Sequence, residues 1–261
     1  MLARSTSLPP CDKARVLLCN DDGIHAPGIK ALQRCMAPLC AEVWVVAPEH
    51  ECSGVAHSLT LHRPLRLRQL DAHTYAVDGT PTDCVLLAVK HILRDKKPDL
   101  ILSGFNAGGN LGEDVTYSGT VAAAMEATVL GIPAIALSQL RDYDQQEDDW
   151  RIANLWTPKI IDRLMSHDWQ DGVFFNVNFP CCDEGEVRGM VTAYQGRHCG
   201  GGLLEEKIDP RGRPYFWVGN VGSHIKPEKG SDLDEIAKNN ITITPLHLDL
   251  THRPSMDTLS L

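Results

Sequence analysis

Short apolar segments alternate with helix-like segments between residues 15 and 140, and this alternation constrains the fold more than any other feature. Short apolar runs bounded by turn-forming residues predict buried strands. They occupy residues 15–20, 41–48, 99–104 and 132–138. The intervening segments predict helices at 27–39, 81–94 and 118–131. Because strands that are apolar throughout need helices on both faces, we expect an α/β fold with a mostly parallel sheet flanked by helices.

The last part of the chain has a different pattern. A helix is expected at 149–165 and a strand at 173–180. Three later segments alternate apolar and polar residues as strands do, and they are VRGMVTAYQG, RPYFWVG and ITITPLHLDL. We interpret them as antiparallel hairpins in a C-terminal extension at about 181–261, which follows a core at about 14–180 within one domain, 14–261. An isolated hairpin is marginal in water, so we expect subunits to pair into a homodimer or homotetramer.

Charge and cysteine content argue against several classes of protein. The formal net charge is −9 and Lys and Arg are not clustered, which argues against binding to a nucleic-acid polymer. No apolar run is long enough to span a membrane, and the Ser- and Pro-rich residues 1–13 predict a flexible leader. The nine cysteines include no C-x-x-C pair, and the adjacent Cys181 and Cys182 lack a surrounding ligand pattern. We therefore expect a reducing compartment and a cytoplasmic protein.

Two adjacent carboxylates, Asp21 and Asp22, follow the first predicted strand in the sequence NDDG. Adjacent carboxylates at the end of a buried strand repel each other and lose hydration, so a compensating group is expected. Asn, Asp and Gly also form turns, and an Asp can cap the helix that starts near Pro27. In parallel sheets, however, ligands bind beyond the carboxyl ends of the strands, where carboxylates can hold Mg²⁺ or Mn²⁺. Local chemistry alone leaves both interpretations open.

A glycine-rich segment, SGFNAGGNLGEDVTYSGT at 103–120, follows the third predicted strand. It matches neither the P-loop pattern nor the dinucleotide-binding pattern. Long loops in compact domains are usually functional, with a plain flexible connection as the alternative. Ser118, Gly119 and Thr120 stand at the start of the next helix, where free backbone N–H groups attract an anion. The segment therefore predicts a phosphate site without a lysine.

Six segments together resemble the SurE family, the survival-protein phosphatases that act as 5′/3′-nucleotidases. In chain order they are LLCNDDGIHAPGI, SGVAHSLTL, VDGTPTDCV, DLILSGFNAGGNLGEDVTYSGTVAAAMEA, DPRGRPYFWVG and ITITPLHLDL. The resemblance runs from about residue 15 to about residue 250. It implies a Rossmann-like core with a C-terminal β-hairpin extension for oligomerisation.

The resemblance also implies a metal site. It places one divalent cation per subunit, Mg²⁺ or Mn²⁺, on Asp21, Asp22, Ser53 and Asn106. Local chemistry alone favours a turn for Ser53 and Gly54, so the assignment of Ser53 as a ligand depends on the resemblance.

A phosphate pocket is implied beside that metal. The resemblance places Asn110, Ser118, Gly119 and Thr120 in or beside it. The expected catalytic residues are then Asp21, Asn110, Ser118 and Thr120. Among them, Asp21 is the candidate that accepts a proton from the attacking water.

The expected activity is hydrolysis of nucleoside 5′-monophosphates by metal-activated water, with 3′-monophosphates and short polyphosphate as further candidate substrates. Two alternatives remain. The first is a phosphatase that forms an aspartyl-phosphate on Asp21. The second is a non-catalytic nucleotide-binding module whose acidic pair caps a helix. Loops at 50–58 and 197–202 are expected to line the ribose and base side.

The chain departs from the family pattern at three places after its leader. Cys19 replaces a small hydroxyl residue before NDDG, and His57 stands where a small polar residue is usual. The segment KNNITITPL lacks the Gly-Tyr pair often found before the last strand. None of these departures removes an expected metal ligand.

Overall fold

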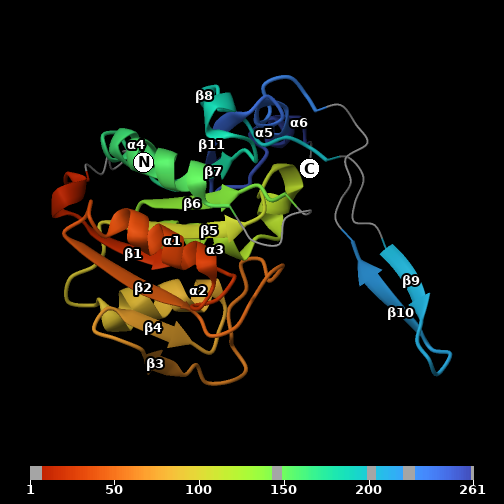
Figure 1. Cartoon of the computed structure of the whole chain (residues 1–261), viewed down its shortest axis with the longest axis horizontal. Coiled ribbons are helices and arrows are strands. Elements are labelled where there is room, and N and C mark those ends of the chain that lie inside the picture. The colour runs from red at the N-terminus through yellow and green to blue at the C-terminus, as the bar shows by residue number, and fades with distance from the viewer. Residues whose placement is uncertain (1–7, 143–148, 199–203, 220–226, 260–261) are drawn as a thin grey trace.

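One sheet of nine strands forms the centre of the computed structural model, which describes residues 8–142, 149–198, 204–219 and 227–259 (Figure 1). The strand order is β3-β4-β2-β1-β5-β6-β7-β11-β8. The bounds are β1 (Arg15–Cys19), β2 (Glu42–Pro48), β3 (Leu67–Gln69), β4 (Thr74–Val77), β5 (Leu100–Ala107), β6 (Ala134–Gln139), β7 (Val173–Phe179), β8 (Gly189–Thr192) and β11 (Asn240–His247). From β4 to β7 the neighbouring strands pair in parallel, which confirms the expected α/β fold with a mostly parallel sheet.

Helices cover both faces of this sheet. The larger ones are α1 (Pro27–Met36), α2 (Pro81–Leu87), α3 (Gly119–Val129) and α4 (Arg151–Met165), and two short ones are α5 (Asp232–Ile236) and α6 (Arg253–Thr258). Helices α1 and α4 contribute to one buried cluster, and α2 and α3 contribute to the other. Within the described ranges, no helix combines the length and the apolar character that crossing a membrane requires.

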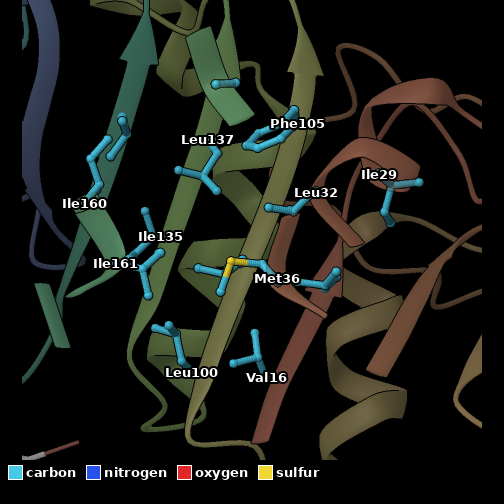
Figure 2. Packing of buried hydrophobic residues seen from close by; sticks show 14 of the residues in the cluster. Val16, Ile29, Leu32, Met36, Leu100, Phe105, Ile135, Leu137, Ile160 and Ile161 are labelled. Carbon is cyan, nitrogen blue, oxygen red and sulfur yellow. The ribbon is translucent and has the colours of Figure 1, made fainter. Parts of the chain in front are cut away.

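The two hydrophobic cores meet at the central strands. Val16 and Leu18 of β1 join the core beside α1 and α4, whereas Leu17 and Cys19 join the core beside α2 and α3. This division follows from the alternation of side chains along a strand. Figure 2 shows the first core, where Met36 of α1 lies among aliphatic side chains of the sheet. Continuous burial on both faces explains why the central strands are apolar throughout.

Helices form in the predicted segments, and two of the expected end residues are confirmed. Pro27 occupies the first turn of α1, and Gly131 follows α3 with a φ of 74°. Helix α2 begins with a capping box in which Thr80 and Asp83 exchange hydrogen bonds. The helix predicted at 81–94 is interrupted, because a π-helical turn (Ala88–Ile92) follows α2.

Strands β3 and β4 were not expected from the sequence. All three residues of β3 are exposed, so that edge strand carries no apolar pattern. Strand β4 has four residues and pairs in parallel with β2. Such short strands give too few positions for periodicity to be recognised.

The interpretation of the last segments as antiparallel hairpins is only partly correct. Strand β11 pairs antiparallel with β7 and parallel with β8. Strands β11 and β8 therefore belong to the main sheet and do not form a separate extension. The core therefore extends past the expected boundary near residue 180. The alternation of Ile and Thr in β11 suggested one solvent-facing side, but Ile241 to Thr244 are all buried between two neighbouring strands. Alternation alone does not identify a strand's partner.

A true hairpin is present in this part of the chain. Strands β9 (Leu204–Ile208) and β10 (Pro214–Val218) pair antiparallel and project away from the main sheet (Figure 1). Every residue of both strands is exposed. The expected C-terminal hairpin extension is confirmed as a structural feature.

The predicted leader, residues 1–13, lies partly outside the described residues, which begin at Leu8. A short 3-10 helix, η1 (Cys11–Lys13), precedes β1 and contacts α4. Leu8 and Cys11 pack against the core beside α1 and α4. From Leu8 onward, this segment is therefore part of the folded domain.

Candidate active site

The expected site residues meet at the carboxyl edge of the parallel strands, where a cavity of about 450 Å³ lies. The loops after β1, β2, β5 and β6 and the start of α3 surround it. Residues from distant parts of the sequence meet here because parallel strands all end at one edge of a sheet. The expected residues on its wall are Asp21, Asp22, Ser53, Asn106, Asn110 and Ser118.

Asp21 and Asp22 follow β1 and are held in different ways. Asp21 is 4 % exposed, and its Oδ1 accepts a hydrogen bond from the hydroxyl of Thr120. The backbone N–H of Cys52 donates to the carbonyl oxygen of Asp21 at 2.8 Å. The Oδ2 of Asp22 accepts from the backbone N–H of Ala107 at 3.3 Å. Both carboxylates are thereby fixed relative to β5 and α3, and neither caps α1, whose N-cap residue is Ala26.

Burial dominates the electrostatics of Asp21. Loss of hydration raises the pKa of this carboxyl above its ordinary value. Hydrogen bonds from the Thr120 side chain and from backbone N–H groups, including that of Gly119, oppose the rise. The charged form of Asp21 therefore depends on donors supplied by the start of α3.

The start of α3 packs directly behind Asp21. A Cβ added to Gly119 would lie 2.7 Å from the Cβ of Asp21, so only glycine permits this approach. Thr120 is completely buried. Among the described residues, Ser118 lines the cavity, whereas Gly119 and Thr120 lie one layer deeper against Asp21. The structure thus brings these residues to the site, but the Thr120 side chain contacts the carboxylate of Asp21 and does not line the cavity wall.

Ser118 is the N-cap residue of α3. Its Oγ accepts a hydrogen bond from the backbone N–H of Val121 at 3.0 Å. Because that bond uses a lone pair, the hydroxyl proton stays available for donation. A residue on the cavity wall can therefore cap the helix and still donate to an anion.

The loop after β2 brings Ser53 to the cavity. The Oγ of Ser53 donates to the Oε1 of Glu51 at 2.9 Å. The loop is tied to α3 at His57, whose Nε2 lies 3.0 Å from the Oε2 of Glu126. The same loop also contacts the segment just before α3, because the backbone N–H of Ala56 donates to the carbonyl oxygen of Tyr117 at 3.0 Å. His57, a departure from the family pattern, therefore helps to hold the loop that carries Ser53.

Asn106 lies at the end of β5 on the cavity wall. Its Nδ2 donates to the carbonyl oxygen of Gly108 at 2.8 Å. Since the amide nitrogen is used internally, the amide oxygen is the atom suited to a cation.

Asn110 is held by a buried polar network that the sequence did not reveal. Its Nδ2 donates to the Oγ of Ser138 at 2.7 Å, and its backbone N–H donates to the Oδ1 of Asn178 at 2.8 Å. Asn176 and Asn178 of β7 both donate to the carbonyl oxygen of Asn110. The signal was present in VFFNVNFP, because two asparagines two positions apart in an apolar strand share one face.

Four further polar or aromatic residues on the cavity wall were not named individually from the sequence, although Glu51 lies in the expected loop 50–58, and they are Glu51, Asp114, Tyr117 and Arg141. Asp114 belongs to a 3-10 helix, η3 (Gly112–Thr116), within the segment expected to be a loop. The Nε2 of His198 lies 3.2 Å from the Oδ2 of Asp114 and 3.0 Å from the carbonyl oxygen of Leu111. Burial raises the pKa of Asp114, and His198 opposes that rise.

The two loops expected to line the ribose and base side lie at different distances from the cavity. In the segment 50–58, Glu51, Ser53 and Gly54 line the cavity. In the segment 197–202, His198 contacts η3, while residues 199–202 lie outside the described ranges. One expected loop thus reaches the cavity wall directly, and the other reaches it through η3.

The donor set fits a hard divalent cation. Two carboxylates, a hydroxyl and an amide share one cavity wall, and these oxygen donors suit Mg²⁺ or Mn²⁺ better than a thiolate-preferring metal. Within the described residues, no group of three or more His, Cys, Asp and Glu could hold a metal. A cation at this site would therefore need Ser53 and Asn106 in addition to the acidic pair.

Comparisons with known sequences and structures all match the chain to proteins of the SurE family. The family model described as survival protein SurE matches residues 16–200. A protein named 5′-nucleotidase SurE from Paramagnetospirillum magneticum is 51% identical, with 94% of each chain covered. One of the same name from Parvibaculum lavamentivorans is 49% identical, with 94% of this chain and 90% of the relative covered. The crystal structure of a SurE protein from Aquifex aeolicus superposes with a TM-score of 0.81 at 40% identity, covering 94% and 98%.

Proposed function

The chain belongs to the SurE family, and we propose on that basis that it is a divalent-metal-dependent phosphomonoesterase that hydrolyses nucleoside 5′-monophosphates. Curated relatives that are about half identical over nearly the whole chain carry the name 5′-nucleotidase. The observation that carries the proposal is the meeting of Asp21, Asp22, Ser53 and Asn106 on one cavity wall beside the N-terminus of α3. This arrangement offers ligands for a cation next to donors for a phosphate.

Asp21, Asp22, Ser53 and Asn106 would hold one Mg²⁺ or Mn²⁺ ion. When bound, such an ion supplies positive charge to a phosphoryl oxygen and lowers the pKa of a water molecule. Burial raises the pKa of Asp21, and a cation beside this carboxylate would oppose that rise by favouring its charged form.

The chain's own groups have separate roles in the proposal. The hydroxyl of Ser118 and the second Nδ2 hydrogen of Asn110, beside the one donated to Ser138, would donate to the equatorial phosphoryl oxygens. Charge is spread over these oxygens during phosphoryl transfer. Gly119 and Thr120, which contact Asp21 on the side away from the cavity, would orient its carboxylate. Asp21 remains the expected acceptor of the proton that the attacking water releases.

Release of inorganic phosphate provides the test. After chelator treatment the chain should release no phosphate from AMP, and activity should return with Mg²⁺ or Mn²⁺. The alternative of a non-catalytic nucleotide-binding module predicts that AMP binds without phosphate release. A covalent aspartyl-phosphate on Asp21 would instead be trapped by rapid acid quench and seen as a phosphopeptide.

A substrate panel should rank nucleotides above a bare phosphate ester. A pocket that contacts ribose and base contributes binding energy away from phosphorus, so AMP or GMP should exceed p-nitrophenyl phosphate in kcat/KM. We expect 5′-monophosphates to be used at least as well as 3′-monophosphates, and short polyphosphate belongs in the same panel. If aryl or sugar phosphates exceed every nucleotide, the activity is a general metal-dependent phosphomonoesterase.

Assembly gives a second prediction, because the hairpin β9–β10 exposes apolar side chains. Phe216, Trp217 and Val218 are 53%, 60% and 80% exposed. Burial of such a hairpin against another copy would stabilise it, so we expect a homodimer or homotetramer. Light scattering at micromolar concentration should give a mass of at least two subunits, and Trp217→Ser with Val218→Ser should lower it. A monomeric mass for the unaltered chain would contradict the proposal.

A further inference from the structure

Two cysteines from distant parts of the sequence lie in contact at the edge of the sheet opposite the candidate active site. The sulfur atoms of Cys11 and Cys40 are 3.1 Å apart. Neither is part of a disulfide, and both side chains are partly accessible. This separation is shorter than an ordinary contact between two sulfur atoms but longer than a disulfide bond of about 2.05 Å.

The backbone explains why these residues meet. Cys11 begins η1 just before β1, and Cys40 lies just before β2, which is the parallel neighbour of β1. Between them, the backbone N–H of Ala41 donates to the carbonyl oxygen of Ala14 at 3.1 Å. The backbone N–H of Ala14 in turn donates to the carbonyl oxygen of Cys11 at 3.0 Å. Main-chain bonds thus hold the two cysteines side by side in the folded domain.

Thiol reactivity distinguishes Cys11 from the surrounding cysteines. A hydrogen bond with the Cys40 thiol lowers the pKa of Cys11, although burial and the nearby Asp12 and Asp162 oppose this effect. Burial raises the pKa of Cys35, the other cysteine near Cys40, to about 11. Since the thiolate is the nucleophile in thiol–disulfide exchange, Cys11 is the favoured attacking group.

We propose that Cys11 and Cys40 form a reversible disulfide by exchange with a low-molecular-weight disulfide such as oxidised glutathione. The bond fastens the segment from Leu8 to Lys13 to the start of β2. The inference goes beyond the proposed hydrolase activity and does not depend on it.

The exchange balances in two steps. The Cys11 thiolate attacks one sulfur of the small disulfide, which forms a mixed disulfide and releases one small thiolate. The Cys40 sulfur then loses its proton and attacks the sulfur of Cys11, which releases the second small thiolate. Two electrons pass from the two cysteines to the small disulfide, and their two protons end on the two small thiols.

The position of the pair separates its effect from catalysis. Cys11 and Cys40 precede the amino ends of β1 and β2, whereas the cavity lies beyond the carboxyl ends of the strands. A disulfide that closes a loop between residues 11 and 40 removes conformational freedom from the unfolded chain. Oxidation should therefore raise thermal stability and leave kcat/KM unchanged.

The test uses the purified full chain, reduced and then incubated with excess oxidised glutathione. After the remaining thiols are alkylated, digestion with trypsin and Glu-C should give a linked peptide containing Cys11, with a loss of two hydrogens. The melting temperature should rise by about 5 °C or more and return after reduction. Because this digest leaves Cys35 and Cys40 on one peptide, the same experiment is run on Cys35→Ser.

Variants locate the bond. Cys35→Ser should keep both the linked peptide and the shift in melting temperature. Cys11→Ser and Cys40→Ser should each lose both. The proposal is overturned if Cys11 and Cys40 both stay alkylated, if Cys11 carries only glutathione, or if the link disappears in Cys35→Ser.

Discussion

Asp22→Asn should lower kcat/KM for AMP on the order of 10²- to 10³-fold while the fold is retained. Asparagine keeps the shape of the side chain and can still accept the hydrogen bond from the backbone N–H of Ala107. The substitution therefore removes one negative charge from the proposed metal site. Weaker attraction for a divalent cation should also raise the Mn²⁺ concentration needed for half-maximal activity.

Asp95→Asn provides the matched control for the charge change. The Asp95 side chain is 93% exposed, and the residue precedes β5 at the opposite edge of the sheet. This variant should keep both kcat/KM and Mn²⁺ affinity. Calorimetric titration of Mn²⁺ into each variant without substrate separates metal binding from turnover. Unchanged Mn²⁺ affinity in Asp22→Asn would remove Asp22 from the ligand set.

The position of the acidic pair could be predicted from general rules. An apolar run followed by NDDG places Asp21 and Asp22 at the end of a buried strand, and parallel strands present such ends at a common edge. The same reasoning brings Asn106 to that edge, because it ends β5, the neighbour of β1. Ser53 required the family resemblance, since a Ser-Gly pair by itself indicates only a turn.

The features that the sequence did not predict depend on contacts between residues far apart in the chain. Asn176 and Asn178 act through bonds to Asn110, 66 and 68 residues away, which no local pattern encodes. The partners of β11 were likewise set by tertiary packing rather than by its own alternation. For Thr120, the sequence placed the residue at a helix start, but only the hydrogen bond from its hydroxyl to the Oδ1 of Asp21 shows that it faces this carboxylate.

Gly119, at the start of α3, has no room for a side chain. An added Cβ would lie 2.7 Å from the Cβ and 2.9 Å from the Oδ2 of Asp21, closer than atoms in contact allow. In an unobstructed helix, alanine is about 0.5–1 kcal/mol more favourable than glycine. Here the clash must displace either the carboxylate or the helix start, and overpacking of this kind costs about 1–3 kcal/mol.

Gly119→Ala should therefore lower the free energy of unfolding and reduce kcat/KM for AMP by about 10²-fold or more, because the carboxylate must remain in place for catalysis. Gly185→Ala is the matched control, since an added Cβ there has no heavy atom within 4 Å. That variant should match the unaltered chain in both measurements. Chemical denaturation and steady-state kinetics distinguish the two effects. If Gly119→Ala loses stability but keeps kcat/KM, the contact between α3 and Asp21 supports the fold without positioning the carboxylate for catalysis.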